Sequence, residues 1–260
     1  MPVLKWVLGP TIFVAVLSLP LFGQQRDAQL IDILTRTVRA AGGPQAVVAV
    51  HDITETGEIT FYWGKGIKGP LTIQMLGGNH FRMEADLPDE KQTWILRNGV
   101  GSLTEKDRSI RMAPQEALNL GNLTYPLAHV VSALADPETD ISFAGIERRN
   151  DRSVYRLRVK GQLGLATKAQ SLPVLKDLLI DALDFDIVGV EDHPFPSHRL
   201  PGNRTVDTTP REIEFADFRV VEGLRVPFLI TTKVHEQKML QIRLSEVHFN
   251  TNLTDEQFKW

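Results

Sequence analysis

The sequence predicts a mainly β protein with a few helices (α+β), built on one strongly curved antiparallel sheet that forms an open half-barrel. Segments of two-residue apolar alternation recur along most of the chain, and turn signals such as Asn98-Gly99 separate them. Only two regions have helical spacing instead. A single antiparallel sheet of about a dozen strands must curl or split. We expect the helices to pack in or across the concave face, because this buries the apolar side of the sheet most economically.

The stretch from Arg211 to Asn250 has the clearest strand pattern. Leu240, Ile242 and Leu244 fall on one face and alternate with polar residues. Gly223 stands where a hairpin turn needs a residue that tolerates positive φ. We therefore expect three antiparallel strands here, with an apolar face that something apolar must cover.

Three consecutive strand segments in the first half of the chain also place their apolar side chains on one face. A fourth, shorter segment runs from Trp94 to Leu96 and ends at the Asn98-Gly99 hairpin signal. The inward-facing residues of the first three segments are Ile59, Phe61, Trp63, Leu71, Ile73, Met75, Phe81 and Met83. Such a surface is either the lining of an apolar cavity or ordinary filled core, and the alternation does not distinguish the two.

Two regions have helical spacing. Asp27 to Ala41 predicts an amphipathic helix that ends at Gly42-Gly43, and a strand-like segment is expected after Pro44. The second region comprises Pro114 to Leu120 and Pro126 to Ala135. Its apolar stripe consists of Leu127, Val130, Val131 and Leu134.

The first residues have the features of a secretory signal peptide. Lys5 precedes an apolar run from Trp6 to Phe22, and Gly23 offers a small residue for cleavage. Prolines and a short core favour a cleaved segment over an uncleaved membrane anchor. We expect residues 1–23 to be the signal peptide and residues 24–260 to form a single domain, with no transmembrane span after cleavage.

Composition narrows the class of protein. The formal net charge is −3, so there is no basic surplus to hold a nucleic-acid backbone, and we exclude that class of partner. The chain has no cysteine, which excludes disulfides, thiolate metal sites and N-terminal lipidation on sulfur. An exported chain without cysteine favours a periplasm of the Gram-negative type.

Few residues suggest chemistry. His193 and His198 lie near two acidic residues, but the prolines between them favour a solvated loop over a metal site. A second acidic group consists of Asp177, Asp181, Asp184 and Asp186. We interpret these residues as solvated side chains of turns rather than as a calcium-binding loop. Nucleophile-elbow, P-loop, dinucleotide and zinc-protease motifs are absent from the sequence. We expect no catalytic residue, no metal and no cofactor, although a hydrolase assembled from scattered Ser, His and Asp stays open.

The order of parts resembles the LolA-like superfamily of periplasmic lipid- or lipoprotein-binding proteins, which includes the outer-membrane lipoprotein carrier and the RseB-like sensors. The resemblance covers most of residues 24–260 through short motifs. They are the opening helix that ends in AAGG, the strand ETGEITFYW, and a closing block of Phe215, Asp217, Phe218, Arg219, Val221, Gly223, Leu224, Val226, Pro227, Phe228, Val247, Asn250 and Phe258. It implies a half-barrel capped by helices, a hydrophobic cavity that receives acyl chains, and no catalysis.

The resemblance therefore implies a periplasmic binding or transport protein that holds a lipid, or the acyl chains of a lipoprotein, in an apolar cavity. The expected cavity lining consists of Ile59, Phe61, Trp63, Leu71, Ile73, Met75, Phe81, Met83, Trp94, Leu127, Val130, Val131 and Leu134. One alternative is an RseB-like envelope sensor or interaction module that binds a partner protein with the same fold. Another is an envelope structural protein whose core is closed.

Overall fold

A computed structural model describes most of the chain after the predicted signal segment. The described residues are 27–62, 66–78, 80–112, 117, 120–121, 123, 126–127, 130–131, 140–163, 172–193 and 210–260. The predicted signal peptide, Trp63, Leu134 and His198 lie outside them. No helix within these ranges combines the length and the hydropathy needed to cross a membrane.

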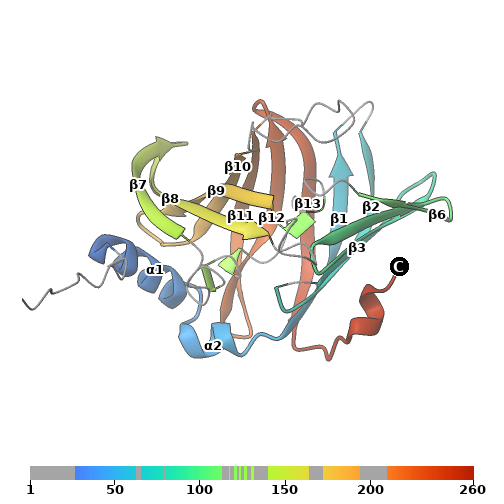
Figure 1. Cartoon of the computed structure of the whole chain (residues 1–260), viewed down its shortest axis with the longest axis horizontal. Helices are drawn as coiled ribbons and strands as arrows, with labels where there is room; N and C mark the ends of the chain where they lie inside the picture. Colours follow the sequence, from blue (N-terminus) through green and yellow to red (C-terminus); the bar gives the residue numbers. More distant parts are fainter. Residues whose placement is uncertain are drawn as a thin grey trace, which may run out of the picture.

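The described chain is mostly β, and its strands form one open antiparallel sheet, as the alternation predicted (Figure 1). The strand order is β6-β5-β4-β3-β2-β1-β13-β12-β11-β10-β9-β8-β7. The bounds are β1 Asp52–Phe61, β2 Ile67–Leu76, β3 His80–Asp86, β4 Lys91–Arg97, β5 Val100–Glu105, β6 Arg108–Arg111, β7 Asp140–Arg149, β8 Arg152–Leu163, β9 Leu172–Asp181, β10 Ile187–His193, β11 Arg211–Val221, β12 Leu224–Val234 and β13 Gln237–Phe249. Strands that lie side by side in the sheet follow one another in sequence, except for β1 and β13.

The pairing of β1 with β13 joins the two halves of the sheet. Ile59 lies opposite Ile242, and Phe61 lies opposite Leu240. The register shifts between Thr56 and Gly57, where β13 carries one extra residue. Such a bulge increases local twist and bends the strand. This join holds an N-terminal meander and a C-terminal meander in one continuous sheet.

Helix α1, Ala28–Ala40, confirms the predicted opening helix. Asp27 caps its N-terminus by accepting a hydrogen bond from the backbone N–H of Gln29 at 2.9 Å. The chain leaves the helix at Gly42, where φ is +125°. The strand-like segment expected after Pro44 is wrong: residues Pro44–Val48 form the short helix α2, because a proline at the first helical position is already set to the helical φ.

The second helical region is confirmed at the positions that the structure describes. Ala117, Leu120 and Gly121 are helical before the break at Leu123, and Leu127, Val130 and Val131 are helical after it.

The hairpin at Asn98-Gly99 is also confirmed, with φ values of 49° and 79° at its two central residues.

One apolar core unites these elements. Side chains from α1, from the second helical region and from strands of both halves of the sheet belong to a single buried cluster. We call the side of the sheet that carries this cluster the core face. In α1 its members are Leu30, Ile33 and Leu34, each at most 2% exposed. The amphipathic stripe of α1 therefore buries against the same core as the strands.

The C-terminal segment folds back on the opposite face of β3 and β4. Asp52 accepts hydrogen bonds from the backbone N–H groups of Thr251 at 2.6 Å and Asn252 at 3.1 Å, which fixes the turn after β13. Arg97 then binds Asp255 at 2.7 Å, and the buried ring of Phe258 packs beside His80. This segment leaves the core face untouched.

Gly57 allows β1 and β13 to approach closely at the bulge, and replacing it tests this contact. A Cβ atom at Gly57 would lie 2.2 Å from the carbonyl oxygen of Arg243, which is backbone and cannot move aside cheaply. We expect Gly57→Ala to lower the free energy of unfolding by about 1–3 kcal/mol in urea titrations. Gly121→Ala is the control, because its Cβ would meet only Leu96 at 3.7 Å in a helical position. Equal stabilities of the two variants would contradict the role of Gly57.

Candidate functional site

The structure buries the residues predicted to line a cavity and brings them together on the core face. The buried members are Ile59, Phe61, Leu71, Ile73, Met75, Phe81, Met83, Trp94, Leu127 and Val130. Val131 is partly buried against them. Trp63 and Leu134 lie outside the described residues.

The strand registers place these side chains in rows that cross β1 to β4. In one row Ile53 lies beside Met75, and Met75 lies beside Phe81. The aromatic rings of Phe61 and Trp94 approach to 6.1 Å between centroids, so the first and fourth strands also meet through their side chains. The result is a continuous apolar surface rich in methionine and aromatic residues.

The next row contains a residue that the sequence reasoning missed. Glu55 pairs in register with Ile73 of β2 and with Val247 of β13, and Ile73 continues the row to Met83 and Trp94. The side chain of Glu55 is 4% exposed, and its Oε2 atom has no hydrogen-bond partner among the described residues. The two-residue alternation of β1 was a signal for this burial, because it places Glu55 on the same face as Ile59 and Phe61.

Burial alone raises the pKa of Glu55 from its ordinary value of 4.5 to about 8. An apolar surrounding disfavours the charged carboxylate, and within the described part of the chain no cation opposes that effect. Glu55 therefore keeps its proton at neutral pH, and a neutral carboxyl group can both donate and accept a hydrogen bond.

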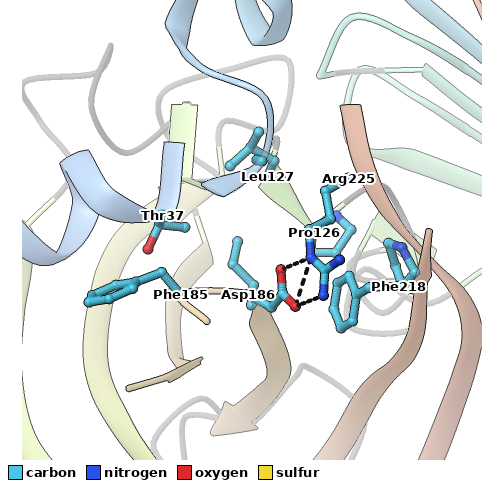
Figure 2. Close-up of a pocket in the computed structure, with 10 residues that line it drawn as sticks. Thr37, Pro126, Leu127, Phe185, Asp186, Phe218 and Arg225 are labelled. Carbon is cyan, nitrogen blue, oxygen red and sulfur yellow. Dashed lines mark hydrogen bonds and ion pairs between the residues drawn. The ribbon is translucent and has the colours of Figure 1, made fainter. Parts of the chain in front are cut away.

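A small pocket lies where the end of α1 meets the β11–β12 hairpin (Figure 2). Its volume of about 20 Å³ has room for a water molecule rather than a lipid chain. Its lining is Thr37, Ala41, Pro126, Leu127, Phe185, Asp186, Ile187, Phe218, Arg225 and Pro227. Leu127 is thus the one residue that this pocket shares with the predicted cavity lining.

An ion pair dominates that pocket. The guanidinium of Arg225 donates to Asp186 through Nε at 2.8 Å and through Nη2 at 2.8 Å, and Figure 2 shows the two groups facing one another. This bond raises the pKa of the arginine. The backbone N–H of Arg225 also donates to the carbonyl oxygen of Ala41 at 3.0 Å. This backbone hydrogen bond fastens the end of α1 to β12, and the ion pair joins β12 to the residue before β10.

The acidic group predicted as solvated turn chemistry is mostly buried, so that prediction is wrong. Asp177 binds Arg156 at 2.7 Å and Arg158 at 2.9 Å, and it is fully buried. Asp181 is buried as well, because it accepts hydrogen bonds from the backbone of the following turn and from an arginine. In the described ranges, no set of three or more His, Asp or Glu side chains is arranged to hold a metal ion.

Comparison with known proteins places the fold. No protein-family model matches the chain, and no curated protein matches it. Among solved structures, a LolA superfamily protein from Nitrosomonas europaea is 12% identical with a TM-score of 0.55, over 88% of this chain and 97% of that chain. A domain from Vibrio parahaemolyticus described as an outer membrane lipoprotein-sorting protein is also 12% identical, with a TM-score of 0.52 over 88% of this chain and 95% of that chain. The chain therefore has a LolA-like fold, as the sequence motifs predicted.

The buried carboxyl group predicts an unusual dependence of stability on pH. The folded chain holds a proton on Glu55 up to about pH 8, whereas the unfolded chain releases it near its ordinary pKa of 4.5. Raising the pH from 6 to 9 should therefore remove about 3 kcal/mol of stability through this group. Glu55→Gln should lack that loss, so the gap between the variant and the wild type should widen as pH rises. Urea titrations at pH 6, 7.5 and 9 measure it, and parallel curves would contradict the buried, protonated state.

Proposed function

We propose that this chain is a non-catalytic periplasmic binding or carrier protein that holds a lipid, or the acyl chains of a lipoprotein, against the core face of its sheet. The observation that carries the proposal is the continuous apolar surface across β1 to β4. In this proposal residues 1–23 are removed as a signal peptide, and the domain of residues 24–260 works with its helices packed across the concave face.

The chemistry of the core face supports an acyl chain as the ligand. Met75 and Met83 have unbranched, polarisable side chains, which adapt to a flexible hydrocarbon at little cost. Each buried methylene contributes roughly 0.8 kcal/mol, so about ten methylenes give micromolar affinity.

The LolA-like fold supports the same class of function. One solved structure with this fold is described as a lipoprotein-sorting protein, and that description concerns its own chain. A catalytic role has no comparable support. Glu55 lies on the core face, whereas His80 and His248 lie on the opposite face of the sheet. We therefore propose lipid or lipoprotein acyl chains as partners, with no cofactor, no metal and no nucleic acid.

Purification of the exported protein followed by lipid extraction tests this function. We expect mass spectrometry to find a co-purifying lipid, and a fluorescent fatty acid to bind with micromolar or tighter affinity. Met83→Ala should weaken that binding roughly three- to tenfold, because it removes part of the apolar contact. Ile110→Ala, at an exposed position on β6, is the control and should leave affinity unchanged.

Repeated absence of both lipid and fatty-acid binding would contradict the proposal. Recovery of one stoichiometric envelope protein without lipid would also contradict it, and it would favour the sensor alternative instead.

A further inference from the structure

Glu55 places a carboxyl group within the apolar surface, and its Oε2 atom has no partner among the described residues. It lies between Ile53 and Gly57 on its own strand, and between Ile73 and Val247 on the two neighbouring strands. Its side chain is almost wholly buried, and none of the described residues gives Oε2 a hydrogen bond. Buried polar groups in folded proteins are nearly always paired, so this one needs an explanation.

The charged residues of the surrounding strands do not supply a partner, because alternation turns them to the opposite face. On β1, β2, β3 and β13 these residues are Asp52, Glu58, Lys68, His80, Arg82, Glu84, Asp86, Arg243, Glu246 and His248. Lys238 is exposed at the far end of β13, beyond a register shift after Leu240. On the core face, the register places Lys176, Asp192 and Arg211 in one row across β9 to β11. The strands β12 and β13 separate that row from β1.

A purely structural role does not account for an unpaired carboxyl group at this position. Leucine or methionine would fill the space between Ile73 and Val247 without the cost of burying a polar group. Groups that reduce stability in this way are typical of binding sites, where they serve a ligand rather than the fold.

We propose that Glu55 is the polar anchor of the lipid site and donates a hydrogen bond from its protonated carboxyl group to a carbonyl oxygen of the ligand. This inference rests on the proposed function, and it specifies the ligand as an acyl ester or amide rather than a bare hydrocarbon. Such a ligand has one carbonyl group at the end of an apolar chain. The site likewise offers one hydrogen-bond donor within an apolar surface.

The neutral state of the carboxyl group favours a carbonyl acceptor over a cationic partner. Burial raises the pKa of Glu55 to about 8, so its proton is available for donation at neutral pH. An amine would require the carboxylate, which the apolar surrounding disfavours. Above pH 8 the carboxylate has no proton to donate, and it repels a carbonyl oxygen.

Displacement of the bound dye N-phenyl-1-naphthylamine by methyl dodecanoate and by dodecane tests the anchor. The preference for the ester is the Kd of the alkane divided by the Kd of the ester. At pH 6.5 we expect this ratio to be about tenfold larger for the wild type than for Glu55→Leu. At pH 9 the wild type should lose this preference. Glu55→Gln should keep it at both pH values, because its amide donates a hydrogen bond without titrating.

Glu58→Gln is the matched control, since Glu58 lies on the same strand but is exposed on the opposite face. It should behave as the wild type at both pH values. Urea titrations of the same proteins should show Glu55→Leu to be at least as stable as the wild type, so that a lost preference does not reflect unfolding.

The wild type and the Glu55 variants could show the same preference for the ester at both pH values. That result would contradict the role of Glu55 as the anchor and leave the proposed lipid binding intact. Tighter binding of dodecylamine at pH 9 that Glu55→Gln abolishes would also contradict this role, because Glu55 would then act as a carboxylate. Failure of both the ester and the alkane to displace the dye from the wild type would overturn the proposed function, and the anchor with it.

Discussion

The pairing of the first strand with the last is the contact on which the rest of the structure depends. It brings β1 and β13 together across almost the whole described chain, and every other pairing in the sheet joins strands that follow one another in sequence. Closing so long a loop has an entropic cost that local hairpins do not have. The close approach of the two backbones at Gly57 and the apolar pairs Ile59–Ile242 and Phe61–Leu240 offset that cost. The same pairing turns two meanders into one continuous sheet, and the N-terminal half of that sheet carries the surface proposed to bind lipid.

Much of this architecture follows from local patterns in the sequence. Strands in which Ile59, Ile73 or Ile242 alternate with polar residues were predictable, because one buried face imposes a period of two. The hairpins were predictable where glycine or asparagine marks them, as at Asn98-Gly99. The β1–β13 join was not predicted, because no local pattern encodes which distant strands pair. The helix after Pro44 was missed because the segment is too short for helical periodicity to appear.

The candidate site also has a part that the sequence predicts and a part that it does not. The apolar members could be named from alternation, since burial depends on which face of a strand a residue occupies. Whether they line a cavity or fill a core depends on side-chain packing from other elements, which alternation does not specify. Glu55 was passed over because a glutamate in a strand is usually on the solvent side, and only the register beside Ile73 and Val247 reveals its burial. The arginine partners of Asp177 and Asp181 were missed for a related reason, because they come from the neighbouring strand β8.

The central claim is that the core face around Ile73 and Met83 receives an acyl chain. The most direct measurement is a set of intermolecular nuclear Overhauser effects between a ¹³C-labelled fatty acid and the methyl groups of the protein. The account predicts contacts from the chain to the methyl groups of Ile59, Ile73 and Met83. Contacts confined to exposed methyl groups such as those of Val48 and Val220, or none at all at saturating ligand, would contradict it.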